Sequence, residues 1–336
     1  MMEQIPDVSI VIAAFNAAAT IERAISGAME QQGVSFEVIV IDDQSTDDTR
    51  DVVAAMADPR IRLIALPRNR GPGGARNAGI DAARGRWIAV LDADDTMRPD
   101  RLAKLVKRAE AENAQIVVDN LAVVTADGTS TPMFQEHDLA KIPTLTLPAF
   151  IHSNVLFQSQ HNFGYLKPVF SRAFLAERGL RFDETLRIGE DYILLASALA
   201  TGAKCVVSPT VGYIYHITEG SISRVLKVEH VEAMIAADAE FVQRHPLDRA
   251  SLAAQRRRQL SLKQALSFVT LVSQLKTRAY GGALRTALGN PVALRHLSMP
   301  IAARLQRLRR TSSATLSNQS PSQQSQPANG PHISKG

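Results

Sequence analysis

Residues 87–95 read WIAVLDADD, and this stretch decides the fold of the chain. Its first five residues form a short apolar run, which is typical of a strand buried on both faces of a parallel sheet. Its second half places Asp92, Asp94 and Asp95 at the carboxyl end of that strand, where open α/β sheets bind their ligands. Three carboxylates so close together repel one another unless a cation neutralises them, and their oxygens suit Mg²⁺ or Mn²⁺. An isolated D-x-D is more often a solvated acidic loop, so the rest of the chain has to decide between the two interpretations.

Strands and helices alternate through the first third of the chain. Apolar runs predict the strands, and segments with helical spacing lie between them. The predicted strands are residues 8–13, 37–41, 61–66 and 87–91, and the predicted helices are residues 20–31, 45–57 and 73–83. This alternation predicts an α/β fold with a mostly parallel sheet sandwiched by helices and with right-handed crossovers.

Polar residues follow three of the four predicted strands. They are Asn16 after the first strand, Asp42 and Asp43 after the second, and Asp92 and Asp94 after the fourth. Because the carboxyl ends of parallel strands meet at one edge of a sheet, we expect these side chains to gather into one site.

Neither of the two common phosphate-binding glycine motifs is present. The turn after the first strand lacks G-x-G-x-x-G, and G-x-x-x-x-G-K-[ST] occurs nowhere in the chain. Gly71, Gly73 and Gly74 precede a predicted helix, but a plain turn explains them equally well. If the ligand carries phosphates, a metal has to meet their charge, and residues 92–95 supply its ligands.

The cysteine count and the hydropathy limit the class of protein. Cys205 is the only cysteine in 336 residues, so an internal disulfide is excluded and a reducing cytosol is expected. Cys205 lies in an apolar run and is expected to be a buried, inert thiol. The sequence has no uncharged apolar window of about 18 residues and no basic-then-apolar leader. We therefore expect a protein that is neither secreted nor membrane-spanning.

Positive charge is concentrated in the last quarter of the chain. The formal net charge is +5, yet residues 249–336 carry 14 of the 38 Lys and Arg and no Asp or Glu. Residues 226–310 predict basic amphipathic helices, and residues 311–336, rich in Ser, Gln and Pro, predict a disordered tail. In residues 301–310, a solvated basic face on a helix packed against the body is the alternative to an interfacial membrane helix. Tyr280 is the only aromatic residue after Phe268, so this region offers few rings on which nucleic-acid bases could stack. We therefore expect an anionic membrane surface, not nucleic acid, as partner.

Three runs of the sequence carry a family resemblance. The runs VSIVIAAFN, VIVIDDQSTDDT and NRGPGGARNAGIDAARGRWIAVLDADD resemble the nucleotide-sugar-binding half of family 2 glycosyltransferases with a GT-A fold, in order and spacing over roughly residues 7–112. Bacterial exopolysaccharide glycosyltransferases of the succinoglycan type look like near relatives. The resemblance implies a nucleotide-sugar-binding half at residues 1–115 and an acceptor and catalytic half at residues 116–225.

The resemblance also implies roles for the residues of the predicted site. Asn16 would bind the nucleotide, Asp43 and Asp42 would contact the base, Arg76 would lie near the base or diphosphate, and Asp92 would lie near the ribose. Asp94 would ligate a Mn²⁺ or Mg²⁺ ion that bridges the two phosphates. A carboxylate can accept the imide N–H of uracil, which favours a UDP-sugar. Two alternatives stay open: Asp42 caps the following helix, or Arg76 pairs with a neighbouring acid.

The second half of the chain adds a candidate base and a second metal ligand. Residues 125–162 show no sustained period and predict a loop-rich wall over a site. Glu190 and Asp191 precede an apolar helix, where acids also suit the helix dipole. By the resemblance, Asp191 is similar to the general base that deprotonates the acceptor hydroxyl, which permits a single in-line displacement with inversion. His216, before a G-S-x-S-like turn, would touch the metal or diphosphate, although the arginine-rich version of this segment is commoner in the family.

These observations predict an inverting, metal-dependent glycosyltransferase at the cytoplasmic face of the membrane. Its acceptor is expected to be a lipid-linked glycan used for a surface polysaccharide. A sugar-nucleotide nucleotidyltransferase is one rival, but the glycine-rich first turn expected there is missing. A non-catalytic protein whose basic tail binds nucleic acid is the other rival.

Overall fold

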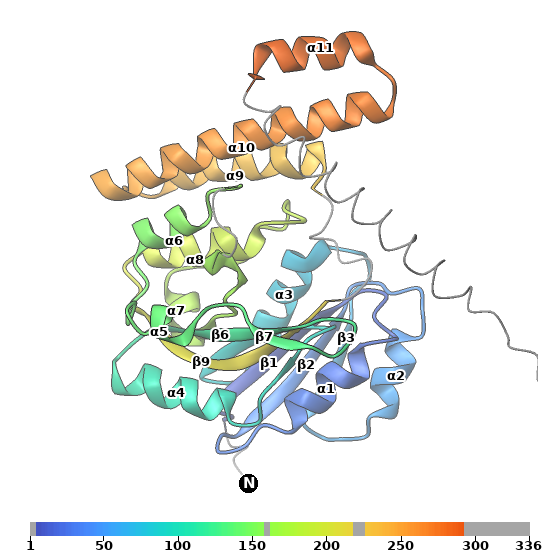
Figure 1. The fold of residues 1–336 in the computed structure, drawn as a ribbon. Helices are drawn as coiled ribbons and strands as arrows, with labels where there is room; N and C mark the ends of the chain where they lie inside the picture. The colour runs from blue at the N-terminus through green and yellow to red at the C-terminus, as the bar shows by residue number, and fades with distance from the viewer. Residues whose placement is uncertain (1–4, 158–161, 218–225, 292–336) are drawn as a thin grey trace, which may run out of the picture. The chain divides into compact units, whose positions relative to one another are not determined.

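The computed structural model describes residues 5–157, 162–217 and 226–291, and it is built on one large sheet (Figure 1). Four parallel strands run in the order β3-β2-β1-β4. They are β1 (Val8–Ala14), β2 (Phe36–Asp42), β3 (Ile61–Ala65) and β4 (Trp87–Asp92). Nearly every residue of β1, β2 and β4 is buried, as apolar runs in a sheet covered on both faces require.

The sheet continues beyond β4 with mixed strand directions. Its remaining strands are β8 (Val169–Ser171), β6 (Ile116–Val124), β9 (Cys205–His216), β5 (Thr96–Met97) and β7 (Ser130–Pro132). Strands β6 and β9 pair in parallel, whereas the antiparallel pairings all involve the short strands β5, β7 and β8. The predicted α/β fold with a mostly parallel sheet is therefore confirmed. The sheet also runs through both predicted halves, 1–115 and 116–225, whose boundary stays a prediction.

Strand β9 continues far beyond its first apolar residues, through Ser208 and Pro209. Its ladder with β6 shifts register between Asp119 and Leu121 and then continues to His216. A proline is tolerated where a ladder is irregular in this way. As a result Tyr213 lies inside the sheet, and His216 ends the strand.

Helices cover both faces of the parallel strands. Helices α1 and α2 lie on one face and α3 on the other (Figure 1), as right-handed crossovers require when the strand order reverses at β1 and β4. In chain order the helices of the first half are α1 (Ile21–Met29), α2 (Thr49–Ala55), α3 (Gly71–Ala82) and α4 (Arg101–Ala111). The stretch predicted to be rich in loops, residues 125–162, holds β7, α5 (Glu136–Leu139) and α6 (Leu147–Ser153), all short. The 3-10 turn η1 (Phe163–Tyr165) follows it.

Five more helices complete the described part of the chain, and α9 and α10 are the longest of them. The remaining helices are α7 (Arg172–Glu177), α8 (Glu190–Ala200), α9 (Val228–Arg244), α10 (Arg249–Lys276) and α11 (Tyr280–Gly289). The chain divides into one compact unit that ends at Thr270 and a second that begins at Leu271. In the part of the chain that the structure describes, no helix has the length and apolar character needed to span a bilayer. The predicted interfacial helix 301–310 and the predicted tail 311–336 lie outside the described residues.

A buried ion pair joins α4 to the sheet. Arg101 is 2% exposed, and its Nη2 donates to Asp119 Oδ1 at 2.8 Å and to the Lys167 carbonyl at 2.7 Å. Its guanidinium carbon lies 5.2 Å from the ring centroid of Tyr213. Burial raises the pKa of Asp119, and Arg101 opposes that rise. The carboxylate therefore depends on Arg101 to stay charged inside the protein.

We expect Arg101→Met to lower the free energy of unfolding by about 3–5 kcal/mol, because it leaves the buried Asp119 without a counter-charge. Urea unfolding followed by circular dichroism measures this loss. Arg60→Met is the matched control, since Arg60 pairs with Asp58 at the surface, and its midpoint should stay close to that of the wild type. Equal midpoints for the two variants would contradict the prediction.

Candidate active site

The carboxyl ends of β1, β2 and β4 meet at one edge of the sheet, as the sequence predicted. Asp42 pairs in register with Ala14 of β1, and Asp92 pairs with Ala13 on the other side. Asn16 and Asp43 follow directly on the first two strands. The polar residues that follow the strands therefore do lie along one edge.

Two cations and three carboxylates form a cluster at the end of β4. Arg76 of α3 donates through Nη2 to Asp92 Oδ1 at 2.7 Å, and through Nη1 to Glu190 Oε1 at 2.6 Å and Asp191 Oδ1 at 3.1 Å. Lys167 Nζ donates to the other oxygen of Asp92 at 2.6 Å and lies 3.7 Å from Asp191 Oδ2. We call these five residues the charge cluster. It brings the start of α8 to the end of β4, although the two are about a hundred residues apart in sequence.

Burial and ion pairing set the protonation of the charge cluster. Burial pushes the pKa of Asp92 upward, but Lys167 and Arg76 outweigh it and hold that pKa well below its ordinary value. Burial and the neighbouring Asp191 raise the pKa of Glu190, against the pull of Arg76. The side chain of Glu190 is 8% exposed and that of Asp191 is 33% exposed. Asp191 is thus the acid of the pair that solvent or a substrate hydroxyl can reach.

The turn after β4 is fastened to β9 through Asp95. This buried carboxylate accepts hydrogen bonds from the Tyr213 hydroxyl and from the backbone N–H of His216, both at 2.8 Å. The Tyr213 oxygen in turn accepts from the backbone N–H of Asp92 at 3.2 Å. Burial, together with Asp92, raises the pKa of Asp95 to about 8. The third acid of the DADD run is thus a structural link and not a solvated side chain.

Asp94 and His216, the two predicted metal ligands, lie at this same turn. Arg23 donates to the Asp94 carbonyl at 2.6 Å, and His216 Nε2 lies 3.1 Å from the Thr96 hydroxyl. Burial and Arg23 lower the pKa of His216, while the charge of Asp94 opposes this shift. Asp94 is therefore close enough to act electrostatically on the imidazole.

The Asp94 carboxylate and the His216 imidazole are the candidate ligands for a divalent ion at this turn. Over the residues that the structure describes, no group of three or more His, Cys, Asp or Glu is arranged to hold a metal. Mg²⁺ is usually bound by one or two carboxylates, with substrate phosphates and water as the remaining ligands. One carboxylate and one imidazole fit an ion that arrives with a diphosphate. They do not fit an ion held by the protein alone.

Asp42 and Asp43 accept hydrogen bonds from neighbouring segments. Asp42 is buried and accepts from Arg50 Nε at 2.6 Å and from the Ser45 backbone N–H at 3.2 Å. Asp43 accepts from the backbone N–H groups of Arg70 at 2.6 Å and Gly71 at 2.8 Å. Asp42 therefore holds the turn before α2, while Asp43 holds the start of α3.

Asn16 closes the same end of the sheet. Its backbone is left-handed, with φ of 51°, and its side-chain oxygen accepts from the Thr46 backbone N–H at 2.8 Å. Its own N–H donates to the Ser45 hydroxyl at 2.9 Å. Phe15, next to it, is 50% exposed. The loops after β1 and β2 are thus joined, with an aromatic ring left open to solvent beside them.

Comparison with known proteins decides the family. The family model for glycosyl transferase family 2 matches residues 9–174. The succinoglycan biosynthesis protein ExoO of Rhizobium meliloti is 64% identical over 307 residues, which cover 91% of this chain and 88% of that protein. This chain belongs to glycosyl transferase family 2. ExoU of the same organism, also a succinoglycan biosynthesis protein, is 34% identical over 86% of this chain and 84% of its own length.

Two solved structures share the fold of this glycosyltransferase. Staphylococcus aureus TarS 1–349 in complex with UDP-GlcNAc superposes with a TM-score of 0.58 at 19% identity, over 78% of this chain and 71% of that one. The mannosyltransferase PcManGT from Pyrobaculum calidifontis, in complex with GDP-Man and Mn²⁺, gives 0.57 at 20% identity, over 93% and 84%. The fold is therefore GT-A, as the sequence predicted.

Two features of the glycosyltransferase site escaped the sequence analysis. Lys167 was not singled out, although a lysine between Leu166 and Val169, in a run that has to be buried, needs an anionic partner. Tyr213 had no predicted role, and its hydroxyl bridges the turn after β4 to strand β9. Arg76 was predicted either to lie near the base or diphosphate or to pair with a neighbouring acid. In the structure it pairs with three acids.

The glycine-rich start of α3 serves close packing. A Cβ on Gly73 would lie 2.8 Å from the carbonyl oxygen of Asp183, so only glycine allows this approach. Asn77, one turn further, exchanges two hydrogen bonds of 2.9 Å with the backbone of Phe182. The segment that leads into α8 is thereby fixed against α3, which carries Arg76.

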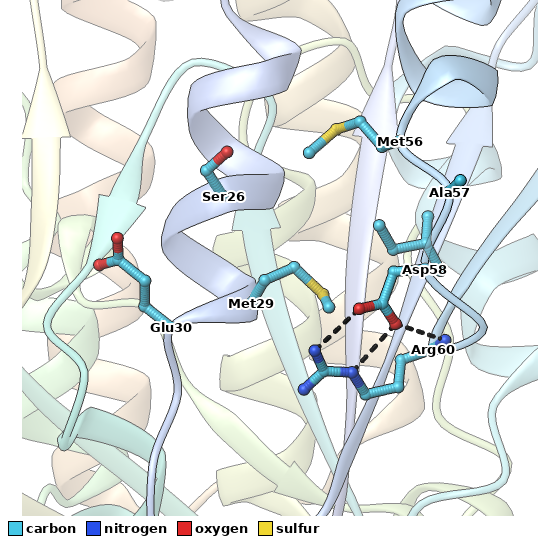
Figure 2. A pocket seen from close by; sticks show the side chains of 8 residues that line it. Ser26, Met29, Glu30, Met56, Ala57, Asp58 and Arg60 are labelled. Carbon is cyan, nitrogen blue, oxygen red and sulfur yellow. Dashed lines mark hydrogen bonds and ion pairs between the residues drawn. The ribbon is translucent and has the colours of Figure 1, made fainter.

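A surface cavity of about 380 Å³ lies away from the glycosyltransferase site. Figure 2 shows its lining, which comes from the end of α1, the segment after α2 and the start of β3. Arg60 and Asp58 form an ion pair in its wall. Because β3 begins at Ile61, the cavity opens at the amino end of that strand, opposite to the charge cluster.

Proposed function

We propose that this glycosyltransferase moves a sugar from a nucleoside diphosphate sugar, preferably a UDP-sugar, to a glycan acceptor with inversion at the anomeric carbon. The observation that carries the proposal is the half-exposed Asp191 carboxylate, oriented by Arg76 and Lys167 beside the carboxyl end of β4. The acceptor is a lipid-linked glycan, and the pathway is exopolysaccharide synthesis. The name of the ExoO relative supports the pathway.

The donor is bound along the edge of the sheet. Asp43 and Asn16 contact the base, the exposed ring of Phe15 offers a face on which a base can stack, and Asp92 lies near the ribose. Asp94 and His216 would hold Mn²⁺ or Mg²⁺ together with the diphosphate, and a bound ion would supply positive charge against the negative charge of the leaving group. The TarS and PcManGT structures, with UDP-GlcNAc and with GDP-Man and Mn²⁺, support a nucleotide sugar as donor.

The chemical step uses the residues of the charge cluster. Asp191 accepts the proton of an acceptor hydroxyl while that oxygen forms its bond to the anomeric carbon. The bond from the anomeric carbon to the diphosphate breaks in the same step, and the electron pair leaves with the nucleoside diphosphate. Arg76 and Lys167 hold the carboxylate in place, and the buried Glu190 orients Arg76.

Release of nucleoside diphosphate tests the proposed reaction. We expect the purified enzyme to release UDP from UDP-sugars faster than GDP or dTDP from the corresponding donors, and to lose this activity in EDTA. Mn²⁺ should restore it. Release of pyrophosphate instead would identify a nucleotidyltransferase and contradict the proposal.

We also propose that the enzyme works at the cytoplasmic face of the membrane, bound to anionic lipid. Part of α10 supports this proposal, because Arg249, Arg256, Arg257 and Lys263 are exposed there at helical spacing together with Leu260, which is 60% exposed. A basic stripe with an apolar side chain suits an anionic lipid surface.

The Arg256→Gln/Arg257→Gln variant is expected to bind phosphatidylglycerol vesicles about thirtyfold more weakly at low salt, since each of the two basic residues contributes about 1 kcal/mol near such a surface. Vesicle sedimentation measures the partition. Arg178→Gln/Arg181→Gln, which removes two exposed charges elsewhere, is the matched control and should bind like the wild type. Stronger loss of binding to DNA than to vesicles would instead favour a nucleic-acid partner.

A further inference from the structure

A buried arginine of α10 contacts the helix that begins with the proposed base. Arg258 is 2% exposed, and its guanidinium carbon lies 3.5 Å from the ring centroid of Tyr192. Its Nη1 donates to the Asn154 carbonyl at 2.8 Å, and its Nε donates to Asp238 of α9 at 3.0 Å. Three separate segments are therefore joined at this one side chain.

Tyr192 is held on both faces and at its hydroxyl. Arg258 covers one face of the ring, and Phe150 of α6 stacks at 5.3 Å between centroids with an interplanar angle of 18°. The hydroxyl donates to Gln255 Oε1 of α10 at 3.1 Å. A cation on an aromatic face contributes more when both groups are desolvated, as they are here.

Helix α9 contacts the residue on the other side of the acidic pair. Gly189, which precedes α8, has a left-handed backbone with φ of 93°, and a Cβ there would meet the side chain of Met234 at 3.4 Å. Helices α9 and α10 thus contact the chain immediately before Glu190 and immediately after Asp191. The N-cap residue of α8 is Gly189, which has no side chain to cap the helix, so tertiary contacts such as these support its first turn.

We propose that Arg258 is a positioning residue of the reaction, which fixes the first turn of α8 and through it the carboxylate of Asp191. The proposal rests on the proposed function, in which Asp191 is the base. A base that is displaced by about 1 Å can cost a hundredfold in rate. The α9 and α10 pair therefore belongs to the catalytic architecture and is more than a support for the membrane-facing stripe.

The test has to keep the fold while it releases Tyr192. Arg258→Met alone would leave the buried Asp238 without a counter-charge. The variant is therefore Arg258→Met/Asp238→Leu, which removes both buried charges. Arg258→Lys keeps the charge but not the planar contact. Arg244→Met, which removes an exposed arginine of α9 that lies outside the basic stripe, is the matched control. We expect the double variant to lower kcat about tenfold or more with the donor KM within about twofold. Arg258→Lys should be intermediate, and Arg244→Met should match the wild type.

Hydrogen exchange without substrates gives a second readout. Backbone amides of residues 189–194 should exchange at least about tenfold faster in the double variant, while those of β4 stay unchanged. In an Asp191→Asn background the double variant should cause no further loss of residual turnover. Unchanged exchange at residues 189–194, or the same loss of kcat in that background, would overturn the proposal. A fully active Asp191→Asn enzyme would instead remove the proposed function itself.

Discussion

The Asp191→Asn enzyme is expected to turn over at least about a hundredfold more slowly than the wild type, while its affinity for the nucleotide sugar stays within about twofold. General base catalysis contributes about 10² to 10⁴ in rate, and an amide cannot accept the proton of the acceptor hydroxyl. Asparagine keeps the shape of the side chain and an oxygen that can still accept from Arg76. Initial rates at saturating acceptor measure turnover, and calorimetric titration with UDP measures binding.

The control for this variant is Asp138→Asn, which neutralises an exposed aspartate on α5. Asp138 forms ion pairs with its neighbours Lys141 and His137. The Asp138→Asn enzyme should keep full turnover. A rate for Asp191→Asn within about tenfold of the wild type would mean that another group takes the proton. The acidic pair would then be a structural element at the start of α8.

Asp94→Asn is expected to abolish the dependence of donor binding on metal. In the wild type, Mn²⁺ should strengthen UDP binding at least about a hundredfold, because in the proposed site Asp94 would hold the ion beside the diphosphate. In the variant, titrations with Mn²⁺ and with EDTA should give nearly equal affinities, and turnover should fall by at least the same factor. Isothermal calorimetry under both conditions measures the effect.

Asp100→Asn is the matched control, since Asp100 lies close in sequence, is exposed and pairs with Lys104. Its response to Mn²⁺ should equal that of the wild type. An Asp94→Asn enzyme that still gained affinity with Mn²⁺ would contradict the role of this carboxylate. The metal would then have to be held by other groups.

The parallel half of the fold could be predicted because strands that are buried on both faces leave an unmistakable pattern. Residues 8–13, 37–41 and 87–91 are mostly apolar, and each run is followed within three residues by a polar residue at the same edge of the sheet. The short strands in the mixed part of the sheet could not be predicted from such a pattern. Strands β5, β7 and β8 have at most three residues each, which is too short for any period to appear.

The charge cluster shows what sequence reasoning can and cannot reach. The family resemblance gave Asp191 and Arg76 separate roles and did not pair them, and nothing in local spacing relates residues more than a hundred positions apart. Lys167 lies in no helix or strand of its own and could be assigned only by asking which charge would neutralise Asp92.

The helix α10 illustrates the same limit. Its apolar face was predicted from helical spacing, and Leu262, Ala265 and Val269 are indeed buried. Arg256, Arg257 and Arg258 look equivalent in sequence, yet only the last of them is buried. Its partners Asp238 and Tyr192 come from two other helices, so tertiary packing alone distinguishes it.

The most direct test is a crystal structure of the wild-type enzyme with UDP and Mn²⁺, with anomalous diffraction recorded at the manganese edge. We expect one anomalous peak, bonded to the Asp94 carboxylate and to oxygens of both phosphates, and the Asp191 carboxylate facing the diphosphate across the space where the sugar belongs. A structure with UDP bound but no manganese between Asp94 and the phosphates, or with Asp191 turned away from the nucleotide, would contradict the proposed mechanism.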